Sequence, residues 1–429
     1  MIRSGNFVAM HYILRNGKGE VLEDKHTVYR HGSSTISPLL QAQLEGLKTG
    51  DSKQITLKKG EEGSDDDFSF EVVIGNIRDT PFPLKIHLLS GFLGSGKTTA
   101  IIRACRLLKK QNIPVAVITN DQGARLVDGD LFTHLGIPSG QVTNGCFCCN
   151  YNDLERTIHR LSPHGSPVLF AESVGSCTDL IATVLKPLLQ QHPEWQPTVS
   201  VFADARLLQS LLDESIASQF DSSVRYIYFK QLEEAQVIVV SKTDLLADKA
   251  SLQGLMQERY GEKITLYQNS FKQEDIALWL TTLDNTLFSN ALPSLDIDYD
   301  RYGAGEAKLA WLDQELEIQS PKNKAQTAAM ALMQNLSSLD YPIGHLKFLL
   351  DGKTKLSFTT TGSTDDHHPE PATCASLLIN ARIQTEPINL SNLVANAITA
   401  IEKDYDCTIR TISKHSFQPG FPKPTHRIA

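Results

Sequence analysis

The order of hydrophobic and polar positions changes character twice along the chain and divides it into three segments. In residues 1–79 hydrophobic and polar positions alternate, a period of two that is typical of strands with one buried face. The alternation is clearest in residues 7–14, 52–57 and 68–74, and a short helix is expected over residues 39–47. We therefore predict a small β-rich domain over residues 1–79.

The second segment, residues 84–290, alternates apolar runs with stretches of helical character. Four runs are apolar almost throughout, at residues 114–119, 167–172, 199–204 and 237–241. Strands of this kind are buried on both faces, which indicates a mostly parallel sheet covered by helices. Ligands of such α/β domains bind at the carboxyl ends of the strands, so the polar residues that follow these runs are candidates for a site.

The third segment, residues 300–429, predicts a small α+β accessory domain. Its pattern reads as a strand, a helix, three strands, a helix and a last strand, over residues 309–318, 324–337, 344–350, 355–360, 375–383, 389–403 and 407–413. The ending at residues 417–427 is rich in proline, so we expect an extended tail against a domain surface.

Composition narrows the class of protein. With 429 residues, 41% of them hydrophobic and 21% charged, the chain is expected to be a soluble protein of two or three domains. A net charge of −8 without a basic stripe argues against a nucleic-acid partner. The first residues lack the apolar core of a signal peptide and no run approaches the length of a membrane span, so we expect a cytoplasmic protein with no membrane partner. In that compartment the seven cysteines are expected to be thiols or metal ligands.

The most informative motif is GFLGSGKTT at residues 91–99. It lies between an apolar run and a stretch of helical character, which is the context of a G-x-x-x-x-G-K-T phosphate-binding loop. Its glycines let backbone N–H groups turn towards phosphate oxygens. Lys97 is expected to reach the β- and γ-phosphates as a catalytic residue, and Thr98 to bind Mg²⁺. The nucleotide-binding residues predicted here are Gly91, Gly94, Ser95, Gly96, Lys97, Thr98 and Thr99.

A second motif, SKTD at residues 241–244, is similar to the N-K-x-D motif with which GTPases recognise guanine. Asp244 would accept hydrogen bonds from the guanine N1–H and amine, and facing adenine it would be left unpaired at a cost of about 1–3 kcal/mol. Lys242 and Asp244 are therefore predicted to bind the base. By itself the pair could be two surface residues after a strand, but beside a phosphate loop it favours GTP.

Glu172 ends a predicted buried strand, and Gly175 follows it closely. A carboxylate in this place could hold Mg²⁺ and orient the attacking water, while Gly175 lets the backbone approach the γ-phosphate. We predict Glu172 as a catalytic and metal-binding residue. The alternative is a simple acidic residue at a strand end.

The motif GCFCC at residues 145–149 places three thiols within four positions. Cys146, Cys148 and Cys149 offer soft ligands that suit Zn²⁺ or Cu(I). A closed zinc site would show paired C-x-x-C spacings, so this cluster predicts an open site from which a metal can move on. If the segment is extended, Cys146 and Cys148 share a face and Cys149 points away. The alternative is a cluster of small buried hydrophobic residues.

In this order and spacing the motifs resemble the CobW-type metallochaperone GTPases, over residues 84–245. The matching elements are the phosphate loop, Asn120-Asp121-Gln122-Gly123, GCFCC, Glu172-Ser173-x-Gly175 and SKTD. The resemblance implies hydrolysis of GTP coupled to delivery of a transition metal to a client apoprotein. Zinc is the first candidate metal, with cobalt or nickel as alternatives, and Cys146, Cys148 and Cys149 handle it.

Two positions depart from the family pattern. Asp121 stands where the family usually has glutamate, and we predict it as a catalytic residue of the segment that senses the γ-phosphate. Ser241 stands where the family has asparagine, which puts base selectivity in question.

Residues 6–78 resemble a trimmed FKBP-type prolyl isomerase, with a shortened segment between residues 60 and 68. Tyr12, Tyr29 and Phe68 are the candidates for lining a proline pocket. Isomerase activity and a role in peptide docking both remain open for this module.

The function that these features favour is a GTP-hydrolysing metallochaperone whose client is held by the FKBP-like module. One alternative is a nucleotide-gated folding chaperone or peptidyl-prolyl isomerase. Another is a small-molecule kinase, against which the SKTD motif argues. The loop Asp365-Asp366-His367-His368, with Cys374 nearby, has metal-ligand chemistry, but solvated polar residues are the favoured explanation.

Overall fold

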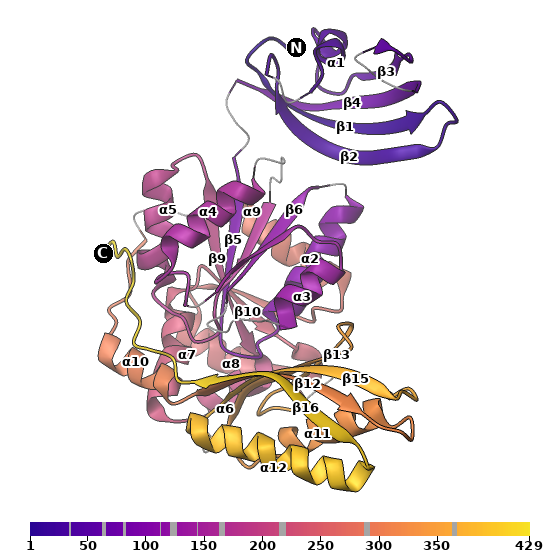
Figure 1. Cartoon of the computed structure of the whole chain (residues 1–429). Helices are drawn as coiled ribbons and strands as arrows, with labels where there is room; N and C mark the ends of the chain where they lie inside the picture. Colours follow the sequence, from indigo (N-terminus) through magenta and orange to yellow (C-terminus); the bar gives the residue numbers. More distant parts are fainter. Residues whose placement is uncertain are drawn as a thin grey trace.

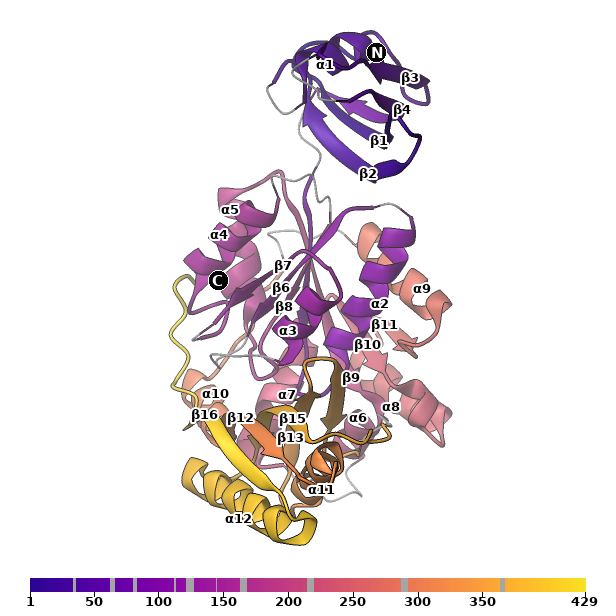
Figure 2. The ribbon, with the colours of Figure 1, turned by 45° about the vertical axis from the view of Figure 1, so that its right-hand side comes forward.

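A computed structural model gives the arrangement of the chain (Figure 1). It describes residues 1–33, 36–61, 66–79, 83–111, 113–120, 127–143, 145–162, 168–213, 220–286, 292–362 and 367–429, with the backbone alone for residues 25, 26 and 128–130. The chain forms three bodies: the N-terminal body stands apart on a single connection, and the other two pack together (Figures 1 and 2). Among the helices of the described ranges, none has the length and apolar character needed to cross a membrane.

The N-terminal body is a four-stranded antiparallel sheet with one helix. Its elements are β1 (Phe7–Asn16), β2 (Val21–Arg30), α1 (Pro38–Leu44), β3 (Ser52–Leu57) and β4 (Phe68–Arg78), in the sheet order β2-β1-β4-β3. The strands expected from alternation are present. The sequence did not predict β2, an edge strand whose middle is polar and whose Val21 and Leu22 are half exposed.

Tyr29, a candidate for a proline pocket, is a core residue of this body. Its side chain is 2% exposed, and its hydroxyl pairs with Nδ1 of His31 at 3.1 Å. Tyr12 packs against the same core and donates to Glu23, and Phe68 is half-buried. A ring enclosed in the core does not line an open pocket, so the expectation for Tyr29 is wrong.

The central body is a seven-stranded parallel sheet covered by helices on both faces, as predicted. Its strands are β5 (Lys85–Ser90), β6 (Val115–Asn120), β7 (Ser139–Val142), β8 (Val168–Glu172), β9 (Gln196–Asp204), β10 (Val237–Ser241) and β11 (Ile264–Gln268), in the order β11-β10-β9-β5-β8-β6-β7. In β5, Leu88 and Leu89 pack into the cores on opposite faces, which is why the strand is apolar at successive positions.

The helices divide between these two faces. One face is covered by α2 (Lys97–Lys110), α3 (Val127–His134) and α9 (Gln273–Asn285). The other is covered by α4 (Tyr151–Leu161), α5 (Lys186–Gln191), α6 (Ala205–Leu212), α7 (Ser222–Glu234) and α8 (Lys249–Tyr260). The carboxyl ends of the strands point towards the third body (Figure 1).

The accessory body is a five-stranded antiparallel sheet with two helices on one face. Its elements are β12 (Ala310–Gln319), α11 (Ala325–Ser337), β13 (Ile343–Leu350), β14 (Thr354–Phe358), β15 (Cys374–Ile383), α12 (Pro387–Tyr405) and β16 (Thr408–Phe417), and the sheet order is β14-β13-β15-β12-β16. The short helix α10 (Tyr299–Ala307) precedes this sheet and packs on α7 of the central body. Helices α11 and α12 cover the apolar face (Figure 2). The other face lies on the central body, where Trp311 joins the central core. The sequence did not predict α10.

The chain ends in an extended tail that runs back along the central body (Figures 1 and 2). Its last residues form specific contacts: the Ile428 N–H donates to the Ala182 carbonyl at 2.9 Å, and Nε of Arg427 donates to Asp179 at 2.8 Å. The tail is therefore held along its length.

Candidate functional site

The loop at residues 91–96 connects β5 to α2 at the carboxyl edge of the sheet. Gly91, Gly94 and Gly96 have φ values of +124°, +72° and +88°, which favour glycine. At Gly91 a Cβ would lie 2.1 Å from the Phe202 carbonyl oxygen, so the loop sits too close to β9 for a side chain. The Lys97 ammonium donates to the Gly91 carbonyl at 2.6 Å, which holds this cation over the loop.

Thr98 and Glu172 meet across the loop. The Thr98 hydroxyl donates to Oε1 of Glu172 at 2.9 Å, and both side chains are buried. The pairing follows from the topology, because β8 lies beside β5 in the sheet and Glu172 is its last residue. A hydroxyl and a carboxylate side by side are hard oxygen donors, which fit Mg²⁺.

Gly175 brings the segment after β8 against the phosphate loop. A Cβ at this position would lie 2.9 Å from the Leu93 nitrogen and 3.0 Å from its Cα, so only glycine allows this approach. A movement of the segment after β8 therefore displaces the phosphate loop, and a movement of the loop displaces that segment.

The predicted base-binding residues lie at the end of β10. Lys242 adopts a left-handed conformation with φ +57°, and its ammonium pairs with Asp204 at 2.8 Å. Asp244 is exposed in the turn that follows. Ser241 donates to the Ser95 carbonyl at 2.6 Å, so the serine that departs from the family pattern ties this motif to the phosphate loop.

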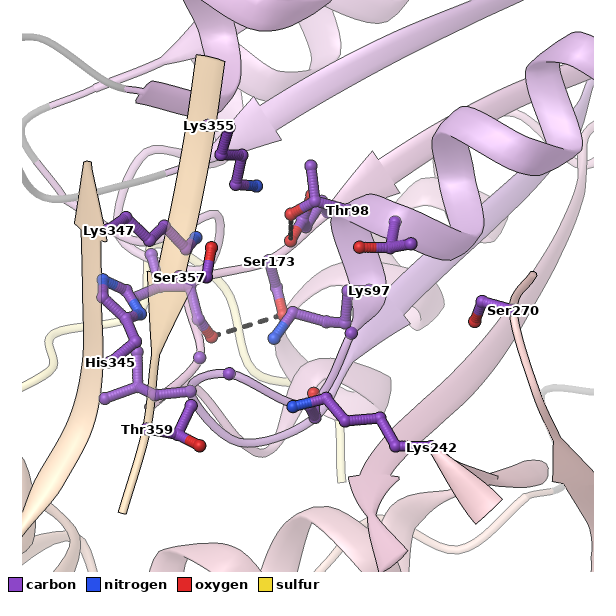
Figure 3. Close-up of a pocket in the computed structure, with 18 of the residues that line it drawn as sticks. Lys97, Thr98, Ser173, Lys242, Ser270, His345, Lys347, Lys355, Ser357 and Thr359 are labelled. Carbon is purple, nitrogen blue, oxygen red and sulfur yellow. Dashed lines mark hydrogen bonds between the residues drawn. The ribbon is translucent and has the colours of Figure 1, made fainter. Parts of the chain in front are cut away.

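One cavity brings most of the predicted residues together (Figure 3). Of the sequence-predicted residues, those that line it are Gly94, Ser95, Gly96, Lys97, Thr98, Thr99, Glu172, Gly175, Lys242 and Asp244. Gly91 contributes through its carbonyl under Lys97. Asp121 lies outside the described residues, whereas its neighbour Asn120 lines the cavity. The accessory body also contributes lining residues, which the sequence did not predict: His345, Lys347, Lys355, Ser357, Thr359 and Gly362.

The three cysteines of GCFCC converge. The Cys146 sulfur lies 2.8 Å from that of Cys148 and 3.1 Å from that of Cys149. The segment is a turn, because the Cys146 carbonyl accepts the N–H groups of Cys149 and Asn150 at 3.1 and 2.9 Å before α4 begins. The expectation for an extended segment, with Cys149 pointing away, is therefore wrong. The turn gives all three sulfurs a common point at which they could hold one metal ion.

Cys177 is a fourth thiol at this cluster, and sequence reasoning missed it. It is fully buried and lies in the segment that begins at Glu172, and its interaction with Cys146 lowers the pKa of that thiol. It is distant from GCFCC along the chain, and only the adjacency of β6 and β8 in the sheet brings the two segments together.

The thiols of these four cysteines differ in pKa. Hydrogen bonds with Cys148 and Cys149, together with the neighbouring Cys177 thiol, hold the pKa of Cys146 well below its usual range. The hydrogen bond to Cys146 raises the pKa of Cys149 to about 11. The cluster therefore favours one thiolate, at Cys146, which is the form that binds metal.

The tail crosses over this cluster. The Thr425 N–H donates to the Cys148 carbonyl at 2.8 Å, and the Lys423 N–H donates to the sulfur of Cys149 at 3.3 Å. The His426 ring stands edge-on to Tyr151, with centroids 4.8 Å apart. The tail thus covers the exposed side of the cysteine turn.

A second group of potential ligands among the described residues is separate from this cluster. Glu155, His159 and His192 have donor atoms within 4.8 Å of one another. In the loop that was predicted to have metal-ligand chemistry, Asp365 and Asp366 lie outside the described residues.

Comparison with known proteins assigns the central body. Residues 85–265 match the family described as CobW/HypB/UreG, nucleotide-binding domain. The zinc chaperone YeiR of Escherichia coli is 27% identical over 194 residues, which cover 44% of this chain and 56% of YeiR. The zinc chaperone YjiA of the same organism is 39% identical over 77 residues, 18% of this chain and 24% of YjiA. The zinc-regulated GTPase metalloprotein activator 1 of Schizosaccharomyces pombe is 27% identical over 183 residues, 39% of this chain and 41% of the activator.

The chain thus spans about half or less of the length of these relatives. Among solved structures, HypB from Helicobacter pylori in complex with nickel aligns with 49% of this chain and 92% of its own, at 16% identity and a TM-score of 0.37. The sheet, the phosphate loop and the family match together identify residues 85–265 as a P-loop nucleotide-binding domain of the CobW/HypB/UreG type.

Proposed function

We propose that this protein hydrolyses GTP and uses the cycle to bind Zn²⁺ at the cysteine cluster and release it to a client protein. The observation that carries this proposal is Asn120. It lines the nucleotide cavity, and its carboxamide donates to the Gly145 carbonyl at 2.7 Å and accepts from the Phe147 N–H at 2.8 Å. One side chain therefore touches both the nucleotide cavity and the backbone of the cysteine turn.

A second connection supports the same coupling. Glu172, the carboxylate proposed to hold Mg²⁺, and Cys177 belong to one short segment. Gly175 lies between them and contacts the phosphate loop. A change at the γ-phosphate that moves this segment would move the sulfur of Cys177 relative to Cys146. Because coupling is reciprocal, metal binding would then alter nucleotide affinity by the same factor.

The donor set favours zinc as the metal carried. Thiolates are soft ligands, and the three converging sulfurs, with Cys177 proposed as a fourth ligand, suit the tetrahedral coordination of Zn²⁺. Three of the relatives named above are described as zinc chaperones or as zinc-regulated, which agrees with this choice.

In hydrolysis, Lys97 would bind the β- and γ-phosphates, and Thr98 and Glu172 would hold Mg²⁺, which shields phosphate charge when bound. Asp121 would act beside the γ-phosphate, and Asp244 would select guanine. The N-terminal module would hold the client, which its separate core and single connection allow.

The test is a zinc titration against a chromophoric chelator under reducing conditions, with GDP and with a non-hydrolysable GTP analogue. We expect the zinc affinity to differ between the two states, and to fall strongly when Cys146, Cys148 and Cys149 are all replaced by serine. Cys105→Ser is the control, because Cys105 is buried in α2 in the core on the other face. Equal affinities in both nucleotide states would contradict the proposal.

A further inference from the structure

The hairpin β13–β14 of the accessory body has two different faces. Its apolar side chains Leu346, Phe348 and Leu356 belong to the accessory core. Because side chains alternate along a strand, the intervening residues project from the opposite face. In an antiparallel sheet such a polar face usually meets solvent. Here it lines the nucleotide cavity with His345, Lys347, Lys355 and Ser357.

Direct packing fixes this hairpin against the phosphate loop. A Cβ at Gly94 would lie 2.2 Å from Cγ2 of Thr359, and a Cβ at Gly344 would lie 2.7 Å from Cδ1 of Leu93. At both positions glycine lets a side chain of one segment pack directly against the backbone of the other. The hairpin lysines are therefore positioned relative to the phosphate loop by packing, and not by a long flexible connection.

Polar contacts beside the hairpin reinforce this placement. The Thr361 hydroxyl donates to Asp204 at 3.2 Å and accepts from Arg206 at the same distance. On the adjacent strand β15, the Asn380 side chain accepts the Val127 N–H at 2.9 Å, at the start of α3. The accessory body thus contacts both the end of β9 and the start of α3.

Lys347 and Lys355 extend into the cavity on the side where Thr98 and Ser173 lie, away from Ser270 (Figure 3). Thr98 marks the Mg²⁺ and γ-phosphate end, while Lys242 and Ser270 mark the base end. A phosphate loop already has its own lysine for the β- and γ-phosphates, so two further ammonium groups at this end match the charge of a terminal phosphate.

We propose that Lys347 and Lys355 bind the γ-phosphate of the nucleotide, so that the accessory body forms part of the hydrolytic site. In hydrolysis the water oxygen bonds to the γ-phosphorus, and the bond from this phosphorus to the β–γ bridging oxygen breaks. Its electron pair stays on GDP. One proton of the water stays on the transferred oxygen as a hydroxyl group of inorganic phosphate, and the other passes to a phosphate oxygen or to solvent. The two ammonium groups stabilise the charge on the transferring phosphoryl oxygens. This inference rests on the proposed nucleotide site.

The test compares Lys347→Ala, Lys355→Ala and the double variant with Lys353→Ala, an exposed lysine in the turn of the same hairpin. We expect each pocket variant to bind a non-hydrolysable GTP analogue about tenfold or more weakly, with GDP affinity within about twofold. GTP turnover of the double variant should fall by about 10²-fold or more. Lys353→Ala should match the parent, and Lys347→Arg should recover part of the analogue affinity because it keeps the charge.

Equal losses for GDP and the analogue, or parental turnover of the double variant, would overturn the inference. Thermal unfolding of each variant separates a folding defect from a lost contact, and arginine variants that fold yet recover no affinity would also count against it. The nucleotide site itself is tested separately by Lys97→Ala. If the parent binds GTP and Lys97→Ala impairs turnover while the hairpin variants behave as the parent, only this inference fails.

Discussion

The carboxamide oxygen of Asn120 accepts the Phe147 N–H at 2.8 Å, in the middle of the cysteine turn. Its amide nitrogen donates to the carbonyls of Val142 and Gly145, so one buried side chain organises the backbone on both sides of the turn's start. Asn120 is also the last residue of β6 and lines the nucleotide cavity. One residue thus contacts both the wall of the nucleotide cavity and the backbone of the cysteine turn.

Replacing Asn120 with alanine should uncouple them. The variant leaves three backbone groups without this partner, two of them buried, which should cost about 1–3 kcal/mol of stability. We expect the difference in zinc affinity between GDP and a GTP analogue to shrink by more than the affinity itself. Chelator competition in both nucleotide states measures this.

Asn150→Ala is the matched control for that variant. Its side chain donates to the Thr143 carbonyl at 3.2 Å, beside the same turn, but it is not among the residues that line the nucleotide cavity. An unchanged difference between the two states in Asn120→Ala would exclude Asn120 as the connection.

The tail should control how fast metal leaves the cluster. Arg427 anchors the tail by an ion pair with Asp179, whose side chain is almost fully buried. Arg427→Ala removes the cation from a buried carboxylate, which we expect to cost about 1–3 kcal/mol, less than in a fully enclosed pair because Arg427 is partly exposed. The released tail should uncover Cys148 and Cys149, so zinc transfer to a chelator should become faster. Stopped-flow chelator assays give the rate.

Lys423→Ala tests whether any tail substitution has this effect. Lys423 contacts Cys149 through its backbone N–H, which the substitution keeps, and its side chain is exposed. Transfer at the parental rate in Arg427→Ala would show that the tail does not restrict exit.

Stability should depend on the protonation of Glu234. This carboxyl is fully buried and accepts the Leu180 N–H at 2.7 Å; burial, followed by the charge of Asp179, raises its pKa to about 8. An unfolded glutamate has a pKa of about 4.3, so near neutral pH the folded chain holds a proton that the unfolded chain has lost. The stabilisation is complete below the unfolded pKa and is lost as the pH rises through the folded one, by at most about 1.4 kcal/mol per pH unit.

Glu234→Gln stays neutral, so its free energy of unfolding should fall less between pH 5 and 8 than that of the parent. Urea unfolding by tryptophan fluorescence reports this, because all three tryptophans, Trp195, Trp279 and Trp311, lie outside the N-terminal body. Glu306, whose burial also raises its pKa to about 8, contributes equally to both proteins. Glu233→Gln, at a partly exposed position, should keep the parental slope, and an identical slope in Glu234→Gln would contradict the assignment.

Motifs and strands that are formed by consecutive residues could be predicted from the sequence. The phosphate loop is one short motif, and the central strands are unbroken apolar runs because both of their faces are buried. The edge strands β2, β7 and β11 were not predicted, because edge strands need fewer apolar residues. Secondary structure in the accessory body was predicted well, yet its contribution to the nucleotide cavity was not.

What could not be predicted depends on which segments meet in space. Cys177 lies far from GCFCC along the chain and reaches it only because β8 pairs with β6. The polar face of β13–β14 has the pattern of a solvent-exposed face, and nothing local indicates that Lys347 and Lys355 turn towards the phosphate loop. The turn at Cys146 likewise depends on Asn120, a residue on another strand.

Cys177 provides the sharpest test of the metal site. If it is the fourth ligand, Cys177→Ser should weaken zinc binding by at least about 10- to 100-fold, a loss that even a supporting residue can cause. Loss of a thiolate should also remove one sulfur-to-metal charge-transfer contribution from the absorbance of the Co²⁺-substituted protein. The Cys105→Ser control should leave both the zinc affinity and the spectrum unchanged, because Cys105 belongs to a different core.

The pH dependence of zinc binding gives a further readout for Cys177. Since thiolates must lose protons before they bind metal, the zinc affinity of the parent should decrease as the pH is lowered, and that of Cys177→Ser should decrease less steeply. A parental spectrum and affinity in Cys177→Ser would leave a three-cysteine site, with no direct ligand from the segment that carries Glu172.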